Sequence, residues 1–255
     1  MAAEGLQRAF RAGRTALVTY LMTGYPDRET SLASVRAAAA AGADLVELGV
    51  PYGDPLADGK TIRTAGWDAL ARGVGLADAL ELAREFVAGE GDPPPVALMT
   101  YYNPMLRMGL DRLADVARDV GVGGFIVPDL PADAANEWLA ASGGLDTVFL
   151  AAPTSTPERL RLVGERSSGF VYCVSSLGVT GVRDDIPGDL TALVERVRAA
   201  TELPVAVGFG IGTPEAAAKV GEIADGVVVG SAIVARQKEP GEVERFVGGL
   251  RGALG

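Results

Sequence analysis

The sequence of 255 residues predicts an α/β fold in which eight parallel strands, each followed by helix, close into a barrel. Three observations lead to this prediction. Short apolar runs rich in β-branched residues alternate with segments of helical periodicity throughout the chain. Apolar residues make up 48% of the chain and aromatic residues only 6%, which indicates an aliphatic core suited to strands buried on both faces. Chains of about 250 residues commonly form one (β/α)8 TIM barrel.

Eight apolar runs are expected to be the strands of this barrel. Because helical segments separate successive runs, the strands must pair in parallel through crossover connections. An open, doubly wound sheet is the alternative arrangement of such units. The runs are 16–22, 44–50, 96–102, 123–129, 146–152, 169–175, 203–209 and 225–231.

Amphipathic segments fill the spaces between the strands. An extra helical segment, 60–73, lengthens the loop after the second strand, and long loops at the catalytic end of a barrel commonly carry function. The turn-rich segment 89–95 connects elements and does not divide the chain, so we expect a single domain over residues 1–255. The other clear helical segments are 31–43, 76–89, 110–121 and 189–200.

Composition excludes several classes of function. The formal net charge of −10 disfavours nucleic acid and anionic membranes as partners, although a local site could still bind a small anion. The single cysteine, Cys173, cannot form an intramolecular disulfide, which is compatible with a reducing compartment. No signal peptide or membrane span is evident, so a cytoplasmic location is expected. The absence of histidine removes His-based acid–base chemistry and His-ligated zinc.

Two carboxylates flank the end of the second strand. Glu47 lies within an apolar run, on the same face as Leu45, and it points either into the barrel mouth or outward to a salt bridge with a covering helix. In the mouth, an apolar pocket would raise its pKa and let it exchange a proton near neutral pH. Asp58 follows in a loop turned back by prolines and glycines; a lone Asp there is commonly a local cap, but its pairing with Glu47 favours acid–base chemistry.

The last three strands supply further candidates. Tyr172 and Cys173 must face opposite sides of the sixth strand, so Cys173 packs against helices if Tyr172 faces the barrel. The small, polar segment 175–185 either closes over a substrate or only connects two elements. Glycines end the seventh and eighth strands, where freed backbone N–H groups and helix starts bind phosphate in many barrels. The segment 208–212 lacks the spacing of a dinucleotide fingerprint.

These segments resemble the tryptophan synthase alpha subunit family, the indole-3-glycerol-phosphate lyases. The similarity extends from about residue 6 to about residue 250 and is most specific in ELGVPYGDPLADG. It implies reversible retro-aldol cleavage of indole-3-glycerol phosphate to indole and glyceraldehyde 3-phosphate, without metal or organic cofactor. The other matching segments are MTYYNP, FIVPDLP, FLAAPTSTPERL, VYCVSSLGVTG, VGFGI and VVVGSAIV.

The resemblance also implies roles for individual residues. Glu47 matches the acid/base that protonates indole C3 and helps to deprotonate the glycerol hydroxyl, and Asp58 matches the carboxylate that binds the indole N–H. Tyr172 matches a tyrosine near the acid/base, and Thr180 matches a loop residue that contacts the aspartate on closure. The positions that match the phosphate site are Gly181, Phe209, Gly210, Gly230 and Ser231; Tyr101 and Asn103 match the mouth, and Asn103 and Asp129 match the face toward a beta subunit.

The sequence departs from the family pattern in and beside the loop that carries Asp58. Tyr52 and Gly53 stand where Phe-Ser is commoner, and Lys60 stands where the family usually has proline. Lys60 could pair with a carboxylate, reach the substrate phosphate, or be solvated. The loss of a proline also frees the backbone of the loop.

Three other kinds of barrel enzyme need residues or positions that this sequence does not provide. A Schiff-base aldolase needs a strand-end lysine, which Lys60, Lys219 and Lys238 do not provide; a metal-dependent sugar-phosphate epimerase would want histidines, and a two-aspartate isomerase places its carboxylates on different strands. The resemblance implies a heterotetramer of two alpha and two beta subunits. A free-standing lyase that releases indole, and a largely regulatory or scaffolding subunit, remain as alternatives.

Overall fold

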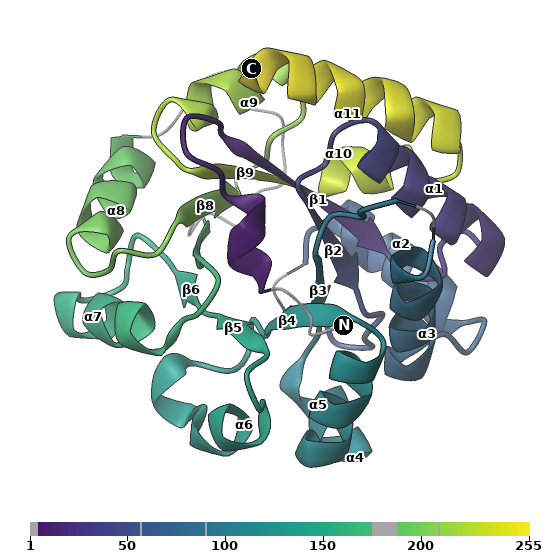
Figure 1. Cartoon of the computed structure of the whole chain (residues 1–255), viewed down its shortest axis with the longest axis horizontal. Helices are drawn as coiled ribbons and strands as arrows, with labels where there is room; N and C mark the ends of the chain where they lie inside the picture. Colours follow the sequence, from purple (N-terminus) through teal and green to yellow (C-terminus); the bar gives the residue numbers. More distant parts are fainter. Residues whose placement is uncertain (1–4, 57, 90, 175–187, 209) are drawn as a thin grey trace.

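A computed structural model describes residues 5–56, 58–89, 91–174, 188–208 and 210–255. Its strands form one parallel sheet in the order β5-β4-β3-β2-β1-β9-β8-β7-β6, surrounded by a ring of helices (Figure 1). The sheet ends at β5 (Asp146–Val148) and β6 (Leu150–Ala151), which are consecutive in the chain. These two strands are therefore one barrel strand, interrupted at Phe149, that pairs with β4 through its first half and with β7 through its second. The predicted eight-stranded barrel is confirmed.

Each predicted run contains a strand, but most runs are too long at their carboxyl ends, and the runs 96–102, 123–129 and 225–231 are too long by two or three residues. The strand predicted at 96–102 ends at Met99, because Tyr102 begins a helix whose first turn tolerates Pro104. The strand predicted at 225–231 ends at Val229, because Ser231 also begins a helix. The remaining strands are β1 (Ala16–Met22), β2 (Leu45–Gly49), β3 (Val96–Met99), β4 (Val122–Ile126), β7 (Val171–Val174), β8 (Val205–Gly208) and β9 (Gly226–Val229).

Three helices of the described chain begin at a residue whose side chain caps them. Asp27 accepts a hydrogen bond from the backbone N–H of Thr30 at the start of α1, and the hydroxyls of Thr156 and Thr213 cap α7 and α9 in the same way. The α-helices are α1 (Arg28–Ala40), α2 (Lys60–Leu70), α3 (Leu76–Val87), α4 (Tyr102–Met108), α5 (Leu110–Asp119), α6 (Asn136–Ala141), α7 (Pro157–Arg166), α8 (Gly188–Arg198), α9 (Pro214–Gly221), α10 (Ser231–Val234) and α11 (Pro240–Leu254); η1 (Leu6–Ala9) and η2 (Ala132–Ala134) are 3-10 helices.

Two apolar layers lie on the two sides of the sheet. Side chains that include Val18, Leu45 and Phe170 form the layer inside the barrel, whereas Val46 and Leu48 belong to the larger layer between strands and helices. The helix η1 lies against the inner layer and is drawn in purple near the centre of the ring in Figure 1, with Leu6 fully buried. It closes one end of the barrel, so the site must open at the other. Within the described part of the chain, no helix has the length and apolar character needed to cross a membrane.

Candidate active site

The structure points Glu47 into the barrel. Glu47 lies in β2 on the same face as Leu45, which belongs to the inner apolar layer. Its side chain is fully buried, and both carboxylate oxygens have no hydrogen-bond partner among the described residues. No described residue forms a salt bridge with it, so the alternative of an outward ion pair does not hold. A buried carboxyl without partners strongly favours its neutral form.

The second carboxyl of the pair, Asp58, lies close enough to Glu47 to influence its ionisation. Burial raises the pKa of Glu47 to about 8, and the negative charge of Asp58 contributes to the shift. Burial also raises the pKa of Asp58 to about 6, while a hydrogen bond from Tyr101 and the positive charge of Arg63 lower it. At neutral pH, Glu47 therefore holds a proton and Asp58 does not.

Two tyrosines stand beside the carboxyls and remain neutral. Burial raises the pKa of Tyr20 and of Tyr172 well above the usual value, and the carboxylates add to the effect. Both rings occupy space that glycine leaves open. A Cβ added to Gly49 would lie 2.0 Å from the Tyr20 hydroxyl oxygen, and one added to Gly208 would lie 2.5 Å from that of Tyr172. Strand-end glycines thus make room for the aromatic rings that surround the carboxyls.

Sequence reasoning missed Tyr20, although a signal was present. Tyr20 lies in β1 two residues after Val18, which faces the barrel interior, and it is paired in register with Glu47. Residues paired in register on parallel strands point to the same face of the sheet. The alternation that left Glu47 ambiguous could therefore have placed Tyr20 beside it.

The loop that carries Asp58 is held by aromatic side chains. The Tyr52 ring stacks on Tyr101, with 4.7 Å between the ring centroids. The indole N–H of Trp67, on α2, donates a 3.3 Å hydrogen bond to the carbonyl of Gly53. Tyr101 is nearly fully buried and connects this packing to Asp58 through its hydroxyl. Asp54, by contrast, is exposed.

A hollow of about 400 Å³ adjoins Tyr172 at the ends of β8 and β9. Gly210, Gly230 and Ser231 line it, so the structure brings these three predicted phosphate positions together with the predicted catalytic tyrosine. Thr180, Gly181 and Phe209 lie outside the described residues. Thr61 and Ile62 of α2 also line the hollow, and so does Arg236, which sequence reasoning missed.

Other reactive side chains lie away from this centre. Cys173 packs in the outer layer, as expected if Tyr172 faces the barrel, and burial raises the pKa of its thiol to about 12. Lys60 is exposed at the first position of α2 and does not line the hollow. Across the described ranges, no group of three or more Cys, Asp or Glu residues is placed to hold a metal ion.

Residues that match the partner face of the family lie on the rim. Asn103 is exposed on α4. The side chain of Asp129 accepts a 2.8 Å hydrogen bond from the backbone N–H of Tyr102, so it also fixes the start of α4.

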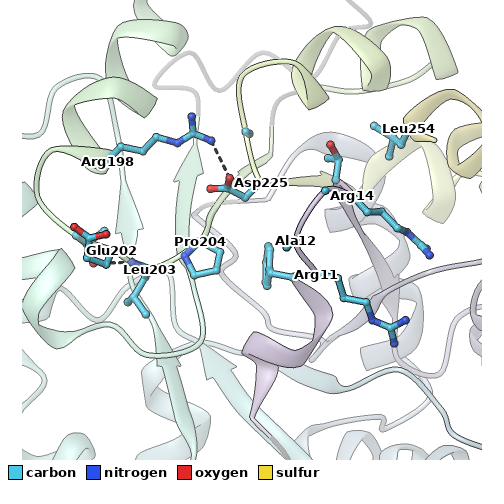
Figure 2. A pocket seen from close by; sticks show the side chains of 14 residues that line it. Arg11, Ala12, Arg14, Arg198, Glu202, Leu203, Pro204, Asp225 and Leu254 are labelled. Atoms are coloured by element: carbon cyan, nitrogen blue, oxygen red, sulfur yellow. Dashed lines mark hydrogen bonds and ion pairs between the residues drawn. The ribbon is translucent and has the colours of Figure 1, made fainter.

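A second hollow, of about 600 Å³, lies where β1, β8 and β9 begin (Figure 2). Two of the arginines in its wall already form ion pairs within the protein: Arg198 pairs with Asp225 at 2.9 Å, and Arg14 pairs with Asp44 at 2.8 Å. Barrel enzymes place their chemistry at the opposite, carboxyl end of the strands. The candidate active site is therefore the smaller hollow beside Tyr172 together with the buried Glu47 and the half-buried Asp58.

Known proteins of one family are similar to this chain over most of its length. The family profile described as "Tryptophan synthase alpha chain" matches residues 6–247. A tryptophan synthase alpha chain from Roseiflexus sp. (strain RS-1) is 49% identical over 252 residues, covering 94% of this chain and 95% of that relative. A structure of Mycobacterium tuberculosis tryptophan synthase matches with a TM-score of 0.91 and 42% identity, over 98% of this chain and 96% of that chain. A structure of the alpha subunit from Legionella pneumophila matches with a TM-score of 0.85 and 33% identity, over 94% and 92%.

Proposed function

Because the chain belongs to the tryptophan synthase alpha chain family, we propose that Glu47, Asp58 and Tyr172 form the catalytic centre of its reaction. The chain is a carbon–carbon lyase of tryptophan biosynthesis that cleaves indole-3-glycerol phosphate to indole and glyceraldehyde 3-phosphate. One observation supports these roles above all: the two carboxyl oxygens of Glu47 are buried and have no hydrogen-bond partner among the described residues. They are therefore available to the substrate.

In this proposal the two carboxyls divide the work by their protonation states. Glu47, protonated at neutral pH, gives its proton to C3 of the indole ring. Asp58, ionised, accepts a hydrogen bond from the indole N–H and stabilises the positive charge that develops on the ring. The Glu47 carboxylate then takes the proton of the glycerol hydroxyl while the C3–carbon bond breaks and its electron pair returns to the ring. Glu47 is thus protonated again at the end of the reaction, and the products are indole and glyceraldehyde 3-phosphate.

The substrate phosphate is proposed to lie in the 400 Å³ hollow, beyond Tyr172. The backbone at Gly210 and Gly230 and the start of α10 at Ser231 supply N–H donors. Phe209, Thr180 and Gly181 are proposed to complete the phosphate site and the closing loop, on the family resemblance alone. This placement puts the indole ring among Tyr20, Tyr172 and the carboxyls.

A beta subunit is the proposed partner, and it would dock on the rim beside the Asp58 loop. Large apolar side chains are exposed there: Leu56 is 83% exposed, and Trp67 and Leu106 are about half exposed. A nearby hollow of about 490 Å³ is lined by Tyr52, Asn103 and other residues of the loop and α4. Exposed apolar patches of this kind commonly mark protein interfaces.

The test is to follow indole release from indole-3-glycerol phosphate by the purified chain, alone and with a tryptophan synthase beta subunit. Slow release that rises strongly on addition of the beta subunit supports both proposals. Fast release that the beta subunit does not change would contradict the partner and favour a free-standing lyase. Retention of most activity in Glu47→Gln would remove Glu47 from the acid/base role.

A further inference from the structure

The proposed phosphate site contains one full positive charge. Of the described residues that line the hollow, all are neutral except Arg236. Glycine amides and a helix start carry only partial charges. The chain as a whole has a net charge of −10, which opposes the approach of a phosphate dianion. A cation in the wall of this hollow is therefore a feature that substrate binding can use.

The Arg236 side chain is held near Ser231. Arg236 lies in the turn after α10, two residues beyond its last residue, Val234. Its Nη1 donates a 2.6 Å hydrogen bond to the carbonyl of Ala232, the residue after Ser231. Its guanidinium carbon lies 4.1 Å from the centroid of the Phe246 ring on α11. These two contacts hold the charged group between Phe246 and Ala232, and Ala232 and Arg236 both line the hollow that contains the proposed phosphate position.

The charge of Arg236 is not neutralised by any carboxylate in the described part of the chain. Arg245, on the neighbouring α11, pairs with Glu242 in the way usual for surface arginines. Arg236 instead contacts a carbonyl and an aromatic face, and a guanidinium has five N–H donors. Donors therefore remain for a ligand at the wall of the hollow.

We propose that Arg236 binds the substrate phosphate and is a specificity-determining residue for phosphorylated substrates. This inference rests on the proposed function, because it takes the hollow beside Tyr172 to be the phosphate site. Arginine suits the task, since its planar fork matches phosphate oxygens and its charge is permanent. The stacking on Phe246 limits the side-chain freedom lost on binding. Lys60, for which reaching the phosphate was one of three possibilities in the sequence, does not line the hollow.

Arg236→Gln tests the proposal, because glutamine keeps an N–H donor for the Ala232 carbonyl but removes the charge. A hydrogen bond to a charged group is typically worth enough to change affinity by about 10- to 100-fold. We expect KM for indole-3-glycerol phosphate to rise by about that factor, with a smaller change in kcat. Inhibition by inorganic phosphate should weaken in parallel, whereas inhibition by the product indole, which has no phosphate, should not. Arg236→Lys should restore part of the loss.

The matched control is Arg245→Gln, which removes a positive charge of similar global effect from α11. An equal rise in KM in the control would overturn the proposal, because the effect would then be general electrostatics. An unchanged KM in Arg236→Gln, with a raised KM in Ser231→Asp, would also overturn it while leaving the phosphate site in place. If both variants bound substrate normally, the proposed phosphate site itself would be wrong.

A readout without turnover separates this inference from the reaction. Inorganic phosphate should raise the melting temperature of the unmodified chain, and Arg236→Gln should lose most of that rise. If the unmodified chain released no indole yet showed this difference, the proposed reaction would fail and the phosphate role of Arg236 would stand. Equal stabilisation of both proteins by phosphate would refute the role.

Discussion

The carboxyl pair should give indole release a bell-shaped dependence on pH. The proposed active form has Asp58 ionised and Glu47 protonated. With pKa values of about 6 and about 8, this form makes up about 80% of the protein at pH 7 and about 10% at pH 5 and at pH 9. We therefore expect kcat/KM to fall about tenfold on each side. Because the two groups interact, the two limbs report the pair and not isolated residues.

The perturbation that tests the assignment of the acid limb is Tyr101→Phe. It removes the hydroxyl that lowers the pKa of Asp58 but retains the ring that stacks on Tyr52. A hydrogen bond to a carboxylate is worth about 1.5 kcal/mol, so the acid limb should move up by about one pH unit. At pH 6 this change alone costs about fivefold in kcat/KM.

The assay is the initial rate of indole release from pH 5 to pH 9 at constant ionic strength. Tyr52→Phe is the control, since it keeps the stacked ring and leaves the Tyr101–Asp58 hydrogen bond intact. An acid limb at the same pH in Tyr101→Phe as in the unmodified chain would refute the role of Tyr101. A flat profile for the unmodified chain would refute the division of protonation states between the carboxyls.

Three further predictions concern the site. Between pH 4.5 and pH 8 the folded chain retains the Glu47 proton that the unfolded chain releases, so Glu47 makes the free energy of unfolding fall by about 4 kcal/mol from pH 5 to pH 9. Glu47→Gln should remove this part of the pH dependence in urea unfolding and leave the smaller part that is due to Asp58. An identical slope in both proteins would mean that Glu47 titrates normally. Ser231→Asp should raise KM by placing like charge against the phosphate, and an unchanged KM would relocate the phosphate. Gly208→Ala should lower kcat because its methyl group would lie 2.5 Å from the Tyr172 hydroxyl oxygen, whereas Gly53→Ala, with open space around it, should not; equal effects would contradict the packing argument.

The strands could be predicted because each one is a nearly continuous apolar run between turn residues. The break at Phe149 could not, since it depends on how the ring closes between β4 and β7. The helix η1 is too short for any periodic signal, and only its burial against the inner layer identifies it as the plug of the barrel. The predicted strands 96–102 and 225–231 likewise included the first residues of the short helices α4 and α10.

The carboxyl pair could be proposed from sequence because both residues flank one strand end. The orientation of Glu47 could not, since Leu45 on one face and Val46 on the other are equally apolar, and a barrel buries both sides of its sheet. Arg236 was missed for a different reason. The sequence predicts a phosphate site made of backbone N–H groups, which depends on glycines and not on side chains. Nothing in the spacing after Ser231 shows that the Arg236 side chain folds back to the Ala232 carbonyl.

The site confines its negative charge to one place. Glu47 and Tyr20 are buried and Tyr172 is half-buried, and burial raises the pKa of each, so all three stay neutral near pH 7. Asp58 alone of this group is ionised, because Tyr101 and Arg63 offset part of its burial. A cation beside Glu47 would relieve the cost of burying it but would also hold it ionised and remove the proton donor. The lack of a partner for Glu47 among the described residues therefore lowers stability but keeps the proton that the proposed reaction needs. The partners of Asp58 keep the anion beside the proposed position of the indole nitrogen.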